Sequence, residues 1–600
     1  MTLSNATTTL AAAVLLTLLS LTPAAAQDDW NPFADRDSRP ARDRGGWPSA
    51  PDRAPPPGQW QPDPRIYGSD RPASNAPAAV ERSDLPPVIA NDGSGLPFDL
   101  WQGLDLATVE QVMSLLALPS PSPTMQKLWL RLMTATSGEP SGATPAAFAA
   151  VRVEGLYRAG MLEPIADALA AAGRAGNDPI LEALGARRAI AIGQREAGCT
   201  GVRNSAARKG DLPPVLRGEM LVLAGYCAAA AGNVSAASLA AELAREEGVK
   251  DAVTLNALEA VAEGRQARVP REGRIGPTQY RLMELAKSVD PAAVLQNGDA
   301  PLISALVLDP ATDDRLRLAA AEWGARSHVI SPAQLAGAWR AQRFAPMDLA
   351  NALESRGDPL SRRAQLFQAA EIERHPGKRV RVLRALLDDA RRGGFYVTAL
   401  AAVAPLVGPP QRGPDAAWLG ELAIEAALAS GDLGAAHAWA SALDGSGEGR
   451  PRSHWLALVD IADPNLRGVR GYSLSAVEAM AAQGRFSAPV LHRLATVLDA
   501  LNYQVPMGLW QMASSTPQPN DGHLPATGVL SQLQGAAKSR EFARTVLLAM
   551  ATLGPNGAEG AHIIALGDTI RALRQLGLEG EARRIGFEAL FAAWPRLASN

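Results

Sequence analysis

Apolar residues recur at helical spacing from about Gly95 to the C-terminus, and this periodicity constrains the fold more than any other feature of the sequence. It is visible in residues 115–118, 128–133, 148–156 and 181–192 and in many later stretches. We find no run of alternating β-branched residues, the pattern that predicts strands. The sequence therefore predicts an all-α fold.

Proline and glycine mark where the predicted helices begin and end. Proline stands near the first turn in Ser122-Pro123, Asp178-Pro179 and Ser331-Pro332. It costs no hydrogen bond there, because the first amide groups of a helix are unpaired anyway. Glycine closes helices because it can adopt the left-handed conformation. These residues divide the chain into many short helices.

One local pattern repeats at several helix ends. A glycine ends one helix, and an alanine follows five positions later in the next helix, where its small side chain lets two antiparallel helices approach closely. Looser copies begin at Gly160 and Gly484. The clear copies are Gly232 to Ala237, Gly394 to Ala399, Gly431 to Ala436 and Gly577 to Ala582.

This step resembles the turn between the two helices of a tetratricopeptide or Sel1-like repeat. The step from Gly394 to Gly431 spans 37 residues, near the usual period of 34 in that family. The resemblance implies an irregular solenoid of helical hairpins with a surface that binds proteins. The alternative is a non-repetitive helical bundle, but about 500 residues exceed the size at which a single helical core stops growing.

The N-terminus has the features of a cleaved secretory signal. Residues 10–22 are an apolar segment, and Ala24-Ala25-Ala26 supplies an A-x-A cleavage site after a proline. Thirteen residues rise only about 20 Å as a helix, too short to span a membrane. We therefore expect residues 1–26 to be removed, leaving a periplasmic protein that does not span the membrane.

Residues 27–94 are predicted to form a disordered linker, a Pro-rich arm in front of the helical region at 95–600. Thirteen prolines fall between Pro32 and Pro87, and such a stretch cannot bury enough apolar area to order itself. Trp30, Trp47 and Trp60 each lie beside or near a proline. We interpret them as candidate docking residues for a partner groove. The alternatives are chance and packing of the arm on its own folded domain.

Two cysteines are present, Cys199 and Cys227. In an oxidising compartment this pair predicts one disulfide. Cys199 is expected in a Gly-rich turn and Cys227 within a helix, so the bridge would join the end of one helix to a later one. The alternative is two unpaired thiols, and the spacing fits neither a metal nor a redox motif.

The net charge and the missing motifs of the sequence argue against several classes of function. A formal net charge of −3 gives no reason to expect nucleic acid as a partner. HExxH, P-loop, GxGxxG and GxSxG motifs are missing from the sequence, so we predict no catalytic residue, metal site or cofactor. Arginine outnumbers lysine 52 to 6, which we attribute to a GC-rich coding background.

A short segment, Gly508 to Met512, resembles the Gly-Leu-Met-Gln segment of soluble lytic transglycosylases. In that family a catalytic glutamate precedes the segment, whereas the corresponding position here is near His492. The upstream acids are Asp499 and the more distant Glu478. A glycosidase needs a general acid, so we interpret Leu509 and Trp510 as core residues of a helix.

The densest basic cluster runs from Arg374 to Arg384. Because acidic residues follow at helical spacing, we interpret it as a solvated, ion-paired helix face. Two polar stretches, 264–276 and 514–528, are either domain boundaries or long hairpin loops.

The sequence thus predicts a non-enzymatic periplasmic scaffold or adaptor that binds protein partners of the cell envelope. The alternative is an envelope protein that binds or cleaves peptidoglycan, with a site assembled from residues distant in sequence. The sequence does not decide whether the chain is an enzyme, and the missing motifs favour a non-enzymatic protein.

Overall fold

The computed structural model describes residues 89, 92–173, 178–266, 273–410, 414–444, 453–465 and 471–596. These residues form α-helices, short 3-10 turns and isolated β-bridges, without a β-strand among them. The all-α prediction is confirmed. The predicted signal at 1–26 and nearly all of the linker at 27–94 lie outside the described residues. No helix in the described part of the chain is long and apolar enough to cross a membrane.

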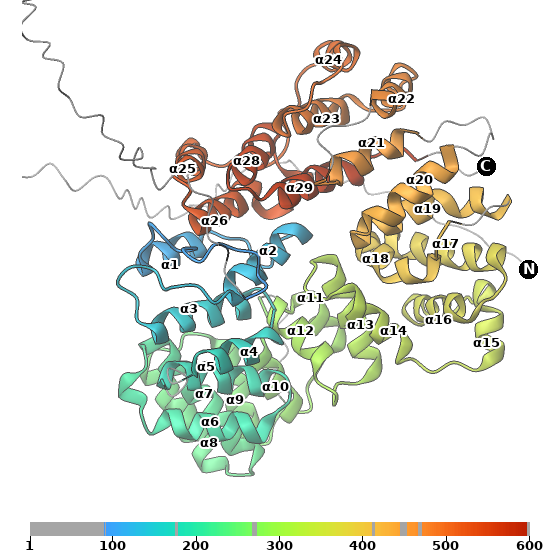
Figure 1. Ribbon diagram of the computed structural model, residues 1–600. Coiled ribbons are helices and arrows are strands. Elements are labelled where there is room, and N and C mark those ends of the chain that lie inside the picture. Colours follow the sequence, from blue (N-terminus) through green and yellow to red (C-terminus); the bar gives the residue numbers. More distant parts are fainter. Residues whose placement is uncertain are drawn as a thin grey trace, which may run out of the picture. The chain divides into compact units, whose positions relative to one another are not determined.

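Short helices follow one another along the whole described chain (Figure 1). The first half comprises α1 Leu106–Ser114, α2 Pro123–Thr134, α3 Pro145–Arg158, α4 Pro164–Ala171, α5 Pro179–Ala191, α6 Arg195–Ala206, η3 Lys209–Asp211, α7 Pro214–Ala230, α8 Val234–Glu246, α9 Ala252–Ala262, α10 Pro277–Leu285, α11 Pro291–Asn297, α12 Ala300–Leu308 and α13 Asp314–Arg326.

The second half continues in the same manner. It comprises α14 Pro332–Arg340, α15 Pro346–Ala350, η4 Ala352–Glu354, α16 Pro359–Ile372, α17 Pro376–Arg392, α18 Tyr396–Val407, α19 Pro414–Ser430, α20 Leu433–Asp444, α21 Ser453–Ala462, α22 Gly471–Ala482, α23 Ala488–Ala500, α24 Met507–Ser514, α25 Thr527–Lys538, α26 Phe542–Leu553, η5 Gly554–Asn556, α27 Gly557–Gly560, α28 Ile563–Gln575 and α29 Glu579–Phe591.

Prolines open many of these helices, as the sequence predicts. Ser122, Asp178 and Ser331 cap α2, α5 and α14, and each side chain accepts a hydrogen bond from a backbone amide of the first turn. The following proline occupies the first helical position in all three. This arrangement satisfies amides that the helix itself leaves unpaired.

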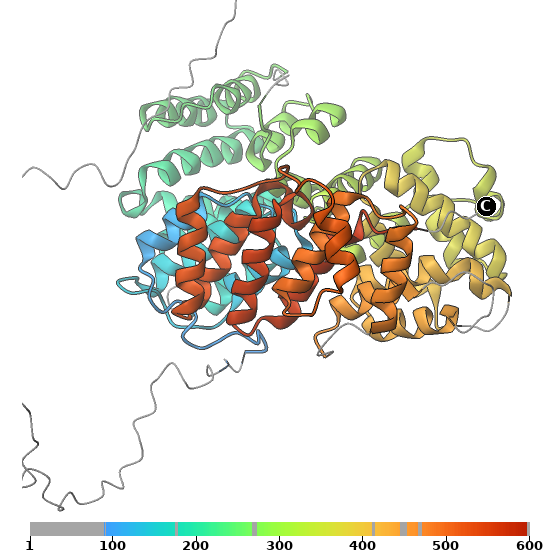
Figure 2. The ribbon, with the colours of Figure 1, turned by 90° about the horizontal axis from the view of Figure 1, so that it is seen from above.

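Helices that follow each other in the chain pack against each other. Contacts join α5 with α6, α7 with α8, α16 with α17, α18 with α19 and α28 with α29. Figure 2 shows the helices of the last third lying side by side along the molecule. The structure is therefore an array of consecutive helix pairs, consistent with a helical-repeat protein.

The predicted turns have the predicted geometry. Gly232, Gly394, Gly431 and Gly577 all have positive φ, between 76° and 83°. The alanines five positions later are completely buried: Ala237, Ala399, Ala436 and Ala582 are each 0% exposed. The glycine therefore closes one helix, and the alanine lies in the contact between the two helices of each pair.

Helix ends with positive φ also occur at positions that the glycine–alanine pattern does not mark. Between α5 and α6, Gly193 has φ +80°, and a glycine, Gly198, takes the place of the buried alanine. Lys287, His328 and Arg540 also have positive φ just after a helix. Positive φ is uncommon outside glycine, so a search for glycine misses these helix ends.

Arginine side chains bind carbonyl groups at the C-terminal ends of other helices. Arg281 donates hydrogen bonds to the carbonyls of Ile190 (3.1 Å) and Ala191 (2.9 Å) at the end of α5. Arg574 binds the carbonyl of Ala500 at the end of α23 (3.0 Å). The same arrangement joins Arg152 to Met133, Arg158 to Met113, Arg583 to Asp460 and Arg584 to Leu428. The last carbonyls of a helix lack the amide partner that inner carbonyls have, so arginine holds neighbouring pairs together.

The two candidate breaks both lie between helices. Residues 264–276 connect α9 to α10, with 267–272 outside the described residues, and 514–528 runs from the end of α24 to the start of α25. Residues 80–600 form one compact unit. The described site residues discussed below all belong to this unit.

Candidate partner-binding surface

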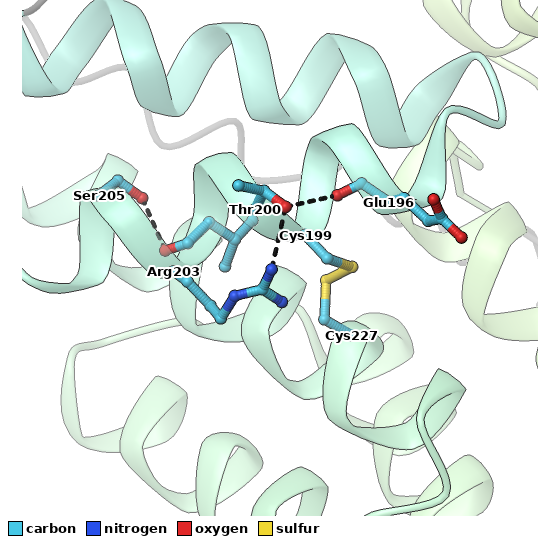
Figure 3. The surroundings of a disulfide bond; sticks show 7 residues. Glu196, Cys199, Thr200, Arg203, Ser205 and Cys227 are labelled. Atoms are coloured by element: carbon cyan, nitrogen blue, oxygen red, sulfur yellow. Dashed lines mark hydrogen bonds between the residues drawn. A yellow bond between two sulfur atoms is a disulfide. The ribbon is translucent and has the colours of Figure 1, made fainter.

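The two cysteines are joined in a disulfide that links neighbouring helices. Cys199 lies in α6 and Cys227 in α7, with their Cα atoms 5.7 Å apart (Figure 3). The expected turn at Cys199 is wrong, because α6 continues through it. The glycines on either side, Gly198 and Gly201, instead let α6 approach α5, and a Cβ on either would press against Ile190 or Ala186.

The surroundings of the disulfide point to a structural role. Thr200 donates to the carbonyl of Glu196, and Arg203 donates to the Thr200 hydroxyl, both at 2.9 Å (Figure 3). Ser205 in turn donates to the carbonyl of Val202 (3.0 Å). All of these bonds stay within α6, so they stabilise the helix that carries Cys199.

The three tryptophans predicted to dock a partner, Trp30, Trp47 and Trp60, lie outside the described residues. Their role remains a prediction.

The basic cluster after Arg374 lies on α17 and at its start. Lys378 pairs with Glu373 (3.1 Å), and Arg379 donates to the Glu373 carbonyl (2.8 Å). At the other end of the helix, Asp389 is paired with both Arg392 and Arg362. These contacts agree with the interpretation of an ion-paired helix face.

The segment that resembles a transglycosylase motif forms α24, and its two predicted core residues differ. Leu509 is buried, 2% exposed, and packs inward together with Ala513 one turn later. Trp510 is 45% exposed, so the prediction that it is a core residue is wrong. The reason is that α24 is a short helix, and among the described helices it packs mainly on α22 and α23, which cover the side of Leu509.

The outer side of α24 therefore carries exposed apolar residues. Met507 is 71% exposed and lies one turn before Trp510 on the same face. We call these two residues the α24 face. Tryptophan and methionine are enriched at protein interfaces, and tryptophan is among the residues that most often dominate binding energy. Sequence alone does not reveal this face, because an apolar residue at helical spacing predicts burial.

Close packing fixes the position of α24. A Cβ on Gly508 would collide with the carboxylate of Glu478 on α22, so glycine permits this approach. After the helix, the Thr516 hydroxyl lies 3.1 Å from Nε2 of His492 on α23. The α24 face is thus presented by a fixed helix.

Glu478 therefore lies close to the segment from which it is thirty residues distant in sequence. In sequence Glu478 is the more distant of the two upstream acids, and the packing of α22 against α24 brings it near the segment. Its carboxylate meets α24 at Gly508, two positions before Trp510 and therefore on a different side of the helix from the exposed tryptophan.

A small cavity of about 230 Å³ lies among α18, α19 and α20. Half of its lining residues are alanines, and Pro405, Asp432 and Trp439 also line it. Trp439 is held by a hydrogen bond from its indole nitrogen to the Gly408 carbonyl (3.1 Å). The cavity is below the usual size of a ligand pocket, about 300–1,000 Å³.

Two histidines show contrasting environments. Burial lowers the pKa of the half-buried His328 to about 4, so this side chain is neutral at pH 7. His437 on α20 lies 3.3 Å from the Asp463 carboxylate, which follows α21. This pair brings together a histidine and a carboxylate from residues 26 positions apart in sequence.

The described residues contain no group of three or more His, Cys, Asp or Glu side chains placed to hold a metal ion. Comparisons with protein-family models, with curated proteins and with solved structures found no match to this chain.

Proposed function

We propose that this protein is a non-enzymatic scaffold of the bacterial periplasm that binds other proteins of the cell envelope. Its fold is proposed to be an irregular solenoid of the tetratricopeptide or Sel1-like type. The predicted signal at 1–26 and the Cys199–Cys227 disulfide support the compartment, since disulfides persist where conditions are oxidising.

The observation that carries the proposal is the α24 face. Met507 and Trp510 expose large apolar side chains on a helix that α22 and α23 hold in place. Complete burial of an aromatic side chain removes about 150–250 Å² of surface from water, and Trp510 still exposes 45% of its surface to a partner. A pre-positioned aromatic residue also loses little conformational freedom on binding.

A crosslinked pull-down from intact envelopes tests the proposal. The bait is the mature protein with a C-terminal tag, compared with the double variant Met507→Ala, Trp510→Ala. We expect discrete protein partners in near-stoichiometric amounts with the unaltered bait. Their recovery should fall about tenfold or more with the variant, because hot-spot residues each contribute 2 kcal/mol or more to binding.

The matched control is Ile564→Ala, which removes a side chain of similar exposure, 47%, from another helix. It should leave recovery unchanged. A bait lacking residues 28–91 tests the separate contribution of the arm and its three tryptophans. Equal recovery by the α24 variant and the unaltered bait would contradict the role of the α24 face.

A second candidate is a protein that binds or cleaves peptidoglycan. The observation in its favour is that Glu478 lies beside the helix of the exposed Trp510. If this reading is right, the mature protein should sediment with purified sacculi, and Glu478→Gln should weaken binding or abolish the release of muropeptides. An eluate that contains muropeptides and no protein partner would favour this candidate over the scaffold.

A further inference from the structure

Helix contacts form a closed circuit within residues 80–600. Starting from α2, contacts pass through α3, α12, α13, α18, α19, α21 and α29, and α29 contacts α2 again. The first described helices therefore meet the last ones, which lie beside them in Figures 1 and 2. We call the α2–α29 contact the seam.

The seam is centred on Glu588 of α29. Its carboxylate accepts hydrogen bonds from the backbone amide of Thr124 (2.9 Å), from the Thr124 hydroxyl (2.6 Å) and from the Ser122 hydroxyl. Ser122 and Thr124 stand at the N-terminus of α2, so a side chain from the far end of the chain helps to cap this helix. An acid is also favoured there by the helix dipole.

Further polar contacts extend the seam. Arg131 of α2 is paired with Glu581 of α29. Beside them, the amide of Ala543 at the start of α26 donates to the carbonyl of Leu100 (3.1 Å). Lys127 approaches Arg584 and Glu588, and burial lowers the pKa of this lysine, with the like charge of Arg584 as a further cause.

Each side of the seam keeps its own support. The Ser122 hydroxyl accepts the amide of Met125 within α2 (3.2 Å), so the helix retains a cap without Glu588. α2 packs on α3, and α29 packs on α21 and α28. On separation, the hydroxyl, amide, guanidinium and carboxylate groups of the seam can bond to water instead.

We propose that the seam is a latch, which opens the closed circuit while the helices on either side stay folded. In the described residues no covalent bond joins the two sides of the seam, because α2 and α29 are far apart in sequence and the disulfide lies between α6 and α7. Opening therefore breaks the seam contacts and strains no connecting loop. A scaffold with such a latch exchanges between a closed and an open array, which changes the surface that a partner meets.

Hydrogen exchange of the full mature chain at pH 7 tests the latch. The variant Glu588→Gln removes the charge that three donors share. We expect amides near the seam, in α1, α2 and α29, to exchange about tenfold faster or more, while amides of α7 keep their protection. Small-angle X-ray scattering of the same variant should show a larger radius of gyration.

The matched control is Glu322→Gln, a buried carboxylate that binds Arg363 and Trp339 away from the seam. It should leave exchange in α2 and α29 unchanged. If Glu588→Gln does not fold, the milder Thr124→Val removes one hydroxyl donor and keeps the backbone bond. Equal acceleration in α7 and α2, or no acceleration at the seam, would overturn the proposal.

Discussion

At the scale of single residues, the excess of arginine over lysine has a structural role that composition does not reveal. Arg281 is 3% exposed and binds two carbonyls of α5, the Asp309 carboxylate and Glu284. A guanidinium presents five donors in a fixed fork, whereas an ammonium has three on a flexible stem. At a position such as 281, lysine could therefore not make all of these contacts at once.

Arg281→Met is expected to lower the free energy of unfolding by about 3–5 kcal/mol, because it leaves the buried Asp309 without its partner. Arg281→Lys should fall between this variant and the wild type. Urea unfolding measures the change. The control Arg571→Met breaks an exposed pair with Asp499 and should cost about 0–1 kcal/mol. Similar losses for both variants would contradict the argument.

Asp299 should make stability depend on pH. Burial raises its pKa from 3.8 to about 6, against opposing effects of the Leu302 amide, Arg274 and Arg187. The folded protein then binds the proton more tightly than the unfolded chain. The free energy of unfolding therefore decreases as the pH rises from about 4 to about 6, and this contribution no longer changes at higher pH. This loss is on the order of 1–3 kcal/mol.

Asp299→Asn tests this expectation, since asparagine keeps a capping oxygen for α12 and does not titrate. Urea midpoints at pH 4, 5, 6 and 7 should show the variant gaining stability relative to the wild type as pH rises. Parallel curves for the two proteins would show that Asp299 does not carry this dependence.

At the scale of helices, the pairing of neighbours follows from local turns, and the disulfide adds a covalent link to one such group. Cys199 and Cys227 are 28 residues apart and join α6 to α7. These helices also pack on each other directly. The link therefore restricts the unfolded chain more than it changes the folded one.

Replacing both cysteines by serine should lower the free energy of unfolding by about 3–4 kcal/mol, from the loss of a closed loop of this length. Urea unfolding of the oxidised wild type, the reduced wild type and the double variant measures it. Reduction and substitution should give the same loss. No difference between oxidised and reduced protein would argue against a stabilising bridge.

At the scale of the whole molecule, the end of the chain is built into the fold. Trp594 is 1% exposed, with its ring edge-on to Phe486 at 5.2 Å. Arg596 pairs with the nearly buried Glu425 on α19 at 3.1 Å. These contacts tie the residues after α29 to α19 and to the loop that precedes α23, so they stabilise the last part of the helix circuit.

Deleting residues 594–600 should cost about 3–5 kcal/mol, the usual effect of losing a buried tryptophan, and Glu425 also loses its ion pair with Arg596 while keeping the hydrogen bond from the Tyr396 hydroxyl. Thermal and urea unfolding measure the change. Arg596→Met is the comparison variant, because it removes the ion pair with Glu425 and keeps Trp594, so it should cost less than the deletion. The seam variants described above also act at this scale, because they separate the two ends of the circuit.

The sequence by itself determined the helical class, the starts of helices at proline and the hairpin turns at Gly232, Gly394, Gly431 and Gly577. These features depend on residues within one or two turns of each other, so the local pattern is sufficient. The buried alanines followed for the same reason, since a fixed spacing from the glycine places them in the helix contact.

Only the tertiary structure decided what surrounds each helix. Trp510 has the spacing of a core residue, yet it is 45% exposed, and Glu478 meets Gly508 from thirty residues away. The α24 face and the seam at Glu588 both depend on contacts between distant segments. Burial and pairing of this kind are properties of packing, which local periodicity does not encode.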